Sequence, residues 1–279
     1  MAAASAPVAP GGAPPAPPAR PAVTSAPLPP ERKGRLWDRG VVQRPEVRAL
    51  VWRADGTARI LGNLDAGTVI VRGNASVVGR VTADRIDVRG TLEGLQPIDV
   101  KGTLFVRGTL RFEGPLAAGT LSHVGPARGG GPIVARQLLE SHGSLEVRIG
   151  GITAPHIALN GSFDVAGPIL AKSVIARVTG LSQVPSIEAD TIVLDRPTRI
   201  PRLLEQFGLL ATEPAVRVDR IEARDVYLDG VECEYVRSEH LLLGPGSHVT
   251  RLDGTVIRKH RSATIGPRSH TAPPHGLSR

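Results

Sequence analysis

The sequence predicts an all-β protein folded as a parallel β-helix (a β-solenoid), from its strand pattern, its repeat and its aliphatic composition. Short runs of alternating β-branched residues recur and often end in glycine, as in 68–72, 85–89 and 103–107. Side chains of such strands alternate between two faces, and glycine marks the turns. Only 3% of residues are aromatic although 41% are hydrophobic, which favours a narrow core of Val, Ile, Leu and Ala.

The repeat selects this architecture among all-β folds. The tripeptide Val-Arg-Gly ends at Gly73, Gly90 and Gly108, and Gly102, Gly108 and Gly114 follow one another at a regular, shorter interval. A coil of about 18 residues divided into three faces of about six residues each is typical of a triangular β-helix. No coil buries its own face, so many coils must stack to form a continuous core. Roughly 210 residues at about 18 residues per coil would give about a dozen coils.

A β-sandwich or barrel is the alternative for many short strands. It would place hairpin turns such as Asn160-Gly and Asp229-Gly between oppositely directed strands. These dipeptides fall in the same rhythm as the Val-Arg-Gly turns, so they are equally compatible with solenoid corners.

The chain divides into a β-helix and flanking segments. Residues 1–35 are a Pro/Ala-rich arm that we expect to be disordered, and residues 36–55 are a candidate N-terminal cap. The β-helix is predicted over 56–268, followed by a disordered basic tail at 269–279. The period breaks near 114–132 and 196–215, and we interpret both stretches as insertions that leave the rod.

The net charge of +8 lies at the two ends of the chain. Basic ends bind nucleic acid, anionic lipid or an acidic partner, and charge alone does not choose among them. Few aromatic residues accompany the basic ones, so no base-stacking platform is indicated. The candidate contacts with DNA or an anionic membrane are Arg32, Lys33, Arg35, Arg258, Lys259 and Arg261.

The sequence favours a reducing, cytoplasmic compartment. The first thirty residues lack a secretory signal, and no apolar run is long enough to span a membrane, although association with a membrane surface stays open. The only cysteine, Cys233, lies in a β-rich run and is expected to be a small buried hydrophobe.

No motif for catalysis, cofactor binding or metal binding stands out, so neither an enzyme nor a small-molecule substrate is expected. The glycine run at Gly129 lacks the Lys-Ser/Thr pair of a phosphate-binding loop, and the histidines show no paired ligand spacing. The enzyme alternative is a left-handed β-helix, as in trimeric acyltransferases and zinc hydratases. Its candidate residue is His123, beside the predicted insertion at 114–132.

The stretch from Val216 to His270 resembles the bactofilins, a family of polymer-forming cytoskeletal proteins. It repeats an acidic-x-hydrophobic-x-hydrophobic pattern and contains Leu-Gly-Pro-Gly-x-x-Val at Leu243–Val249. The resemblance implies a right-handed β-helix that assembles end to end into filaments without nucleotide. It also implies partners among cell-wall or chromosome-positioning proteins. The rod predicted here is about twice the length usual in that family.

We therefore expect a non-enzymatic cytoskeletal scaffold that self-associates through the ends of its rod. Terminal coils expose strand edges and an open apolar core unless they are capped. The residues predicted for self-association, as core or last-coil positions, are Leu241, Leu242, Leu243, Val249 and Ile257. A charge at Leu242 or Val249 is expected to break assembly or folding.

Overall fold

The computed structural model describes Arg32 and residues 34–196 and 216–267, and within this part of the chain every regular element is a β-strand. None of the described residues forms a helix that could cross a membrane. The strands are β1 (Arg35–Arg44), β2 (Val47–Ile60), β3 (Leu64–Val77), β4 (Val81–Gly94), β5 (Ile98–Phe112), β6 (Leu116–Val124), β7 (Ala127–Gly129), β8 (Ile133–Val147), β9 (Ile152–Thr153), β10 (His156–Val165), β11 (Ile169–Leu170), β12 (Ser173–Val178), β13 (Ser182–Asp195), β14 (Val216–Leu228), β15 (Val231–Leu243), β16 (His248–Lys259) and β17 (Thr264–Ile265).

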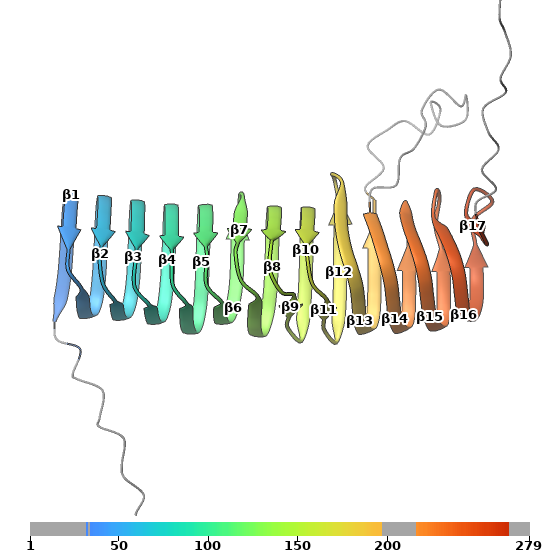
Figure 1. The fold of residues 1–279 in the computed structure, drawn as a ribbon, viewed down its shortest axis with the longest axis horizontal. Helices are drawn as coiled ribbons and strands as arrows, with labels where there is room; N and C mark the ends of the chain where they lie inside the picture. The colour runs from blue at the N-terminus through green and yellow to red at the C-terminus, as the bar shows by residue number, and fades with distance from the viewer. Residues whose placement is uncertain (1–31, 33, 197–215, 268–279) are drawn as a thin grey trace, which may run out of the picture. The chain divides into compact units, whose positions relative to one another are not determined.

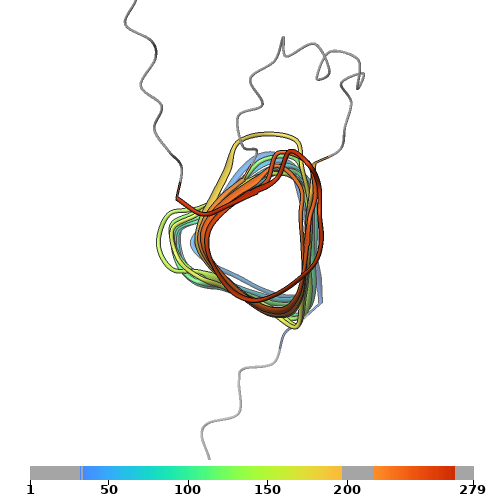
Figure 2. The same ribbon diagram turned by 90° about the vertical axis from the view of Figure 1, so that its right-hand side faces the viewer.

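All pairings are parallel, and each coil lies beside the next one along the chain (Figure 1). Val47 pairs with Leu64, and Leu64 with Val81, so these coils are equal in length and match the interval between Gly73 and Gly90. A register shift in β5 lengthens the following coil slightly, as between Ile86 and Leu104. About 12 turns stack in this way around a triangular section (Figure 2), which confirms the predicted parallel solenoid.

The predicted glycine corners are confirmed by their backbone conformation. Gly73, Gly90 and Gly108 have φ values of 126°, 134° and 135°, a region that side chains rarely adopt. They stack directly, and a Cβ on Gly90 would lie 2.0 Å from the carbonyl oxygen of Gly73. The Val-Arg-Gly repeat therefore reflects a corner that requires glycine in coil after coil.

The core is a set of aliphatic ladders inside the coils. Residues that pair between coils and face inward form columns, such as Val71, Val88 and Val106, each fully buried. Large aromatic side chains enter only at a few levels, among them Trp52 and Phe112. The low aromatic content of the sequence thus matches a narrow interior.

The coils after position 216 are shorter, and the predicted coil length is wrong there. Val216 pairs with Val231, so this coil closes sooner along the chain than the one between Leu64 and Val81. The reason lies in the corners. Two residues separate the buried Leu228 and Val231, whereas the equivalent corner between the buried Val71 and Ala75 has three. A second corner, between Val218 and Ile221, is likewise one residue shorter than that between Val77 and Val81.

Two of the predicted boundaries are wrong. Residues 114–132 do not leave the rod, because β6 pairs with both β5 and β8, and β7 also lies in the ladder. The three glycines at 129–131 lie directly over Phe112, Glu113 and Gly114 of the preceding coil, where a Cβ would collide. The solenoid also begins before 56, since β2 runs through that position and β1 pairs with it.

The other predicted segments fall mostly outside the described residues. These are residues 1–31 and Lys33 of the predicted arm at 1–35, the tail at 269–279 and residues 197–215 of the second insertion. The end of that arm is not disordered as predicted, because Arg35 begins β1. The strands on either side of 197–215 pair directly, for example Val184 with Val218, so the ladder is continuous across it.

Candidate self-association site

The N-terminal end of the solenoid carries charged side chains at core positions. In β1, Asp38 pairs with the buried Ala54 and Arg44 with the buried Ile60, so both occupy inward columns. The Arg44 guanidinium donates to Asp38 with its Nε 2.8 Å from Oδ2. Trp52, which is fully buried in the next coil, donates its Nε1–H to the same oxygen at 2.9 Å.

This arrangement gives the N-terminal end a polar lid. Asp38 is only 5% exposed, and its pKa lies below the usual value, mainly because Arg44 donates hydrogen bonds to it and also because Trp52 does. Burial opposes this shift without reversing it. Inward-pointing charges on a terminal strand discourage pairing with another chain. Residues 36–55 are thus part of the solenoid, and the Asp38–Arg44 ion pair in its first described coil is what could act as the cap predicted there.

The C-terminal end exposes apolar side chains in other inward columns, whereas the column that begins at Asp38 ends at Lys259, which pairs with the buried Leu243. In β16, Leu252 pairs with the buried Val236 and Val256 with the buried Leu241, yet both β16 residues are only partly buried. Ile257 and Ile265 are 59% and 40% exposed. In the part of the chain that the structure describes, β17 pairs only with His248 and Val249, leaving the rest of the outer edge of β16 without a strand partner.

The predicted self-association residues separate into two groups. Leu241, Leu243 and Val249 are buried in the core, as is Val236, so they support the fold rather than offer a surface. Leu242 points outward, 37% exposed, and its predicted place in the core ladder is wrong. Ile257 is exposed on the last coil, where self-association was predicted.

An outward apolar row was missed by sequence reasoning. Ala158, Ile175, Val193, Tyr227 and Leu242 pair in succession across five coils, and Ile175 is 51% exposed. Seen singly, each residue belongs to an ordinary alternating strand. Only the register brings them into one row, so no local signal in the sequence would have found it.

The predicted basic-tail residues do not form a common surface. Arg258 and Lys259 belong to β16 and Arg261 to the turn after it, all exposed at the C-terminal end, whereas Arg35 begins β1 at the other end. Lys33 lies outside the described residues.

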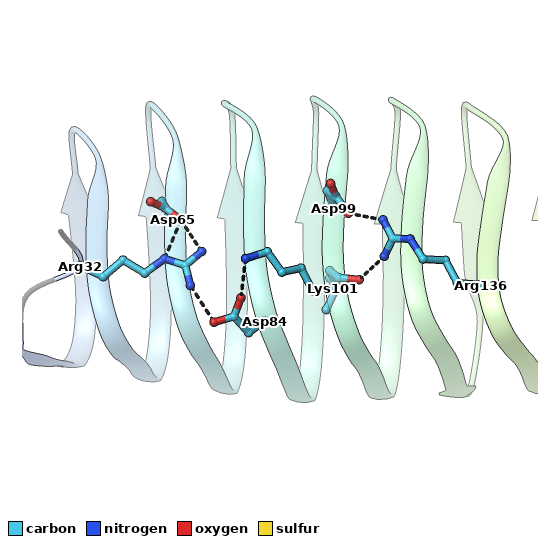
Figure 3. A network of polar contacts seen from close by, with 7 residues as sticks. Arg32, Asp65, Asp84, Asp99, Lys101 and Arg136 are labelled. Carbon is cyan, nitrogen blue, oxygen red and sulfur yellow. Dashed lines mark hydrogen bonds and ion pairs between the residues drawn. The ribbon is translucent and has the colours of Figure 1, made fainter. Parts of the chain in front are cut away.

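Arg32 contacts the side of the solenoid instead of acting as a tail residue (Figure 3). Its Nε lies 3.0 Å from Asp65 Oδ1 and its Nη1 lies 2.7 Å from Asp84 Oδ2. Lys101 of the following coil lies 3.3 Å from the other Asp84 oxygen. The Arg32 side chain is 19% exposed, so the prediction that it is available to DNA or lipid is wrong.

The same face carries a second bridge between coils. Arg136 donates to the Asp99 carboxylate at 3.0 Å and to the Val100 carbonyl at 3.1 Å, from two coils away (Figure 3). Exposed pairs of this kind contribute about 0–1 kcal/mol each, so we assign them to fastening neighbouring coils.

His123 is inside the solenoid and not on a face. It is 1% exposed, and neither ring nitrogen has a hydrogen-bond partner. Burial lowers its pKa to about 4; the Gly125 backbone partly opposes this shift and the nearby His142 adds to it. The prediction that His123 stands beside a protruding loop is therefore wrong, and with it the candidate residue of the enzyme alternative.

Cys233 is buried, as predicted. Burial raises the pKa of its thiol to about 12, and Sγ lies 3.2 Å from the Tyr235 carbonyl. Within the described ranges, no group of three His, Cys, Asp or Glu side chains is arranged to hold a metal ion.

Comparison of the chain with protein-family models, curated proteins and solved structures finds no match. The resemblance of Val216–His270 to the bactofilins accordingly stays a prediction from the sequence. The physical contrast between the two ends of the solenoid carries the functional argument.

Proposed function

We propose that this chain is a non-enzymatic structural scaffold whose solenoids self-associate through their C-terminal ends. The observation that carries the proposal is the difference between the end coils. At the N-terminal end two inward columns hold the Asp38–Arg44 ion pair. At the C-terminal end two other inward columns hold Leu252 and Val256, half-covered and without a lid among the described residues, while the Asp38 column ends there at the exposed Lys259.

Two physical terms favour association at this end. Removing apolar surface from water contributes roughly 25 cal/mol per Å², and the outer edge of β16 offers backbone groups to a second strand. A second copy of the same end supplies both, because a two-fold interface places identical surfaces against each other. Arg258 and Lys259 of this coil are exposed, Lys259 above the buried Leu243, and solvent can screen their repulsion.

The polar lid sets how far assembly proceeds. Covering Asp38 and Arg44 with another solenoid would bury an ion pair further without adding an apolar contact. Joined pairs of rods are therefore the unit that we propose, and growth into the filaments predicted from the sequence would require the β1 coil to open. Partners at the cell wall or chromosome remain predictions of the resemblance.

Sedimentation velocity of the full-length protein at about 10–100 µM tests the proposal. We expect wild type to sediment as a dimer and Val256→Asp as a monomer, because the charge would lie in the interface. Val41→Asp is the matched control, since Val41 is 88% exposed on the N-terminal coil. A monomeric wild type, or equal dimerisation of both variants, would contradict the proposal, provided circular dichroism shows folded β-structure.

A further inference from the structure

The Val-Arg-Gly repeat builds a column of arginines that the self-association site does not use. Arg72 pairs with Arg89, and Arg89 with Arg107, so the three side chains stand in register on β3, β4 and β5. All three are exposed, and none forms an ion pair with a described residue. Parallel strands lie roughly 4.8 Å apart, so the column is a line of positive charge along the rod.

Two carboxylates lie near this line and neutralise it in part. Asp55 pairs with Arg72; its pKa is lowered mainly by the hydrogen bond from Arg53 at 3.0 Å, and also by Trp37 at 2.8 Å and by the Arg72 charge. Asp87 stands two residues before Arg89 on β4 and pairs with Phe105. Val124 follows Arg107 at the other end. Like charges directly opposite on neighbouring strands are destabilising, so an unpaired arginine column favours an anionic partner that offsets the repulsion.

Other arginines of the solenoid show the contrast. Arg128 lies 2.7 Å from Glu146, and Arg136 and Arg148 also contact carboxylates on other coils. Several outward arginines thus form ion pairs, whereas Arg72, Arg89 and Arg107 form none with a described residue.

The neighbouring side chains indicate the kind of anion. Asn74, Thr91 and Thr109 form an adjacent polar column just beyond the corner glycines. Arginine, amide and hydroxyl groups are the usual donors to phosphate oxygens in nucleic-acid backbones. Phe105, with the Arg107 guanidinium 5.5 Å from its ring centroid, stands beside the column as a stacking surface for a base.

We propose that the arginine column, Arg72, Arg89 and Arg107, binds the phosphate backbone of a single nucleic-acid strand laid along the rod. The column is linear and charged, and no apolar side chain flanks it on the Asn74–Thr109 side as a membrane anchor would. Binding at backbone phosphates is independent of sequence and falls as salt rises. The site lies away from both ends and is independent of the proposed dimer.

The test is fluorescence anisotropy of full-length protein with labelled oligothymidylate of about 20 nucleotides, from about 50 to 200 mM salt. The triple variant Arg72→Gln, Arg89→Gln, Arg107→Gln is expected to bind at least about tenfold more weakly. Its slope of log affinity against log salt should fall by about 2, since each single-strand phosphate contact contributes about 0.7.

The matched control removes three ion-paired arginines, in the triple variant Arg128→Gln, Arg136→Gln, Arg148→Gln. It changes the net charge equally and should keep the affinity within about twofold. Equal losses in both variants would overturn the proposal, because net charge alone would then explain binding. Wild type that binds anionic lipid vesicles or polyglutamate but not the oligonucleotide would overturn it as well. Thermal unfolding checks that both variants are folded.

Discussion

At the scale of single residues, the corner glycines combine a steric requirement with a backbone conformation that favours glycine. Gly90 combines a φ of 134° with a Cβ position 2.0 Å from the carbonyl oxygen of Gly73. Gly90→Ala is therefore expected to lower the free energy of unfolding by about 2–4 kcal/mol. Gly180→Ala is the control, since its Cβ would meet only Ser162, whose Cβ lies at 3.3 Å. Chemical denaturation measures both, and equal effects would contradict this view of the corner.

Lowering the pH is expected to destabilise the folded protein through His123. Its pKa is about 4 in the folded protein against 6.5 for the free side chain, because burial disfavours the charged ring. Below about pH 6.5 the unfolded chain takes up a proton that the folded one excludes, so stability falls as pH drops from there to about 4. The loss amounts to about 3 kcal/mol over that window.

The variant His123→Leu isolates this contribution. It places an aliphatic side chain in the column of Val88 and Val106, where the polar contact that the ring loses is that with the Gly125 backbone. The variant should be more stable than wild type at pH 5, and the difference should shrink toward pH 7. Parallel pH profiles of the unfolding midpoint for the two proteins would show that His123 does not titrate in this way.

At the scale of the element, successive side chains of β15 alternate between the core and the surface. Leu241 is fully buried and Leu242 is 37% exposed. Leu241→Asp should destabilise the protein by more than about 4 kcal/mol, because it buries an unpaired carboxylate. Leu242→Asp should cost less than about 1 kcal/mol. Thermal unfolding of the two variants distinguishes them, and comparable losses would contradict the observed strand phase.

How much of these elements was predictable depends on local signals. The strands and corners of 56–108 follow from alternation and the Val-Arg-Gly repeat, because each corner needs glycine at a fixed place. The sequence does not show which residues of β15 face the core, because three successive leucines, Leu241 to Leu243, hide the alternation of apolar and polar side chains. The shorter coils after 216 could not be predicted either, because two corners that each lose one residue leave the strand pattern unchanged.

The coil at 114–132 was misjudged for a related reason. Its glycines at 129–131 suggest a loop when read along the chain, whereas they are required by close contact with the coil beneath, at Phe112 to Gly114. Such a requirement comes from a neighbour one full coil away along the chain, as between Gly114 and Gly131, and local composition does not show it. The same holds for Asp38 and Arg44, whose inward direction follows only from pairing with β2.

At the scale of the whole solenoid, the two ends differ in chemistry while the ladder between them is continuous. The ion pair of Asp38 and Arg44 closes one end, and the exposed side chains of Ile257 and Ile265 mark the other. On this difference rests our proposal that rods join in pairs through their C-terminal ends.

Site-specific cross-linking tests this central claim most directly. Ile257→Cys and Val41→Cys each place one reactive thiol at an end, while Cys233, the only native cysteine, is buried with its thiol pKa raised to about 12. With a short bismaleimide, the account predicts that Ile257→Cys gives a covalent dimer and that Val41→Cys stays monomeric. Cross-linking at Val41 that equals or exceeds that at Ile257 would contradict association through the C-terminal ends.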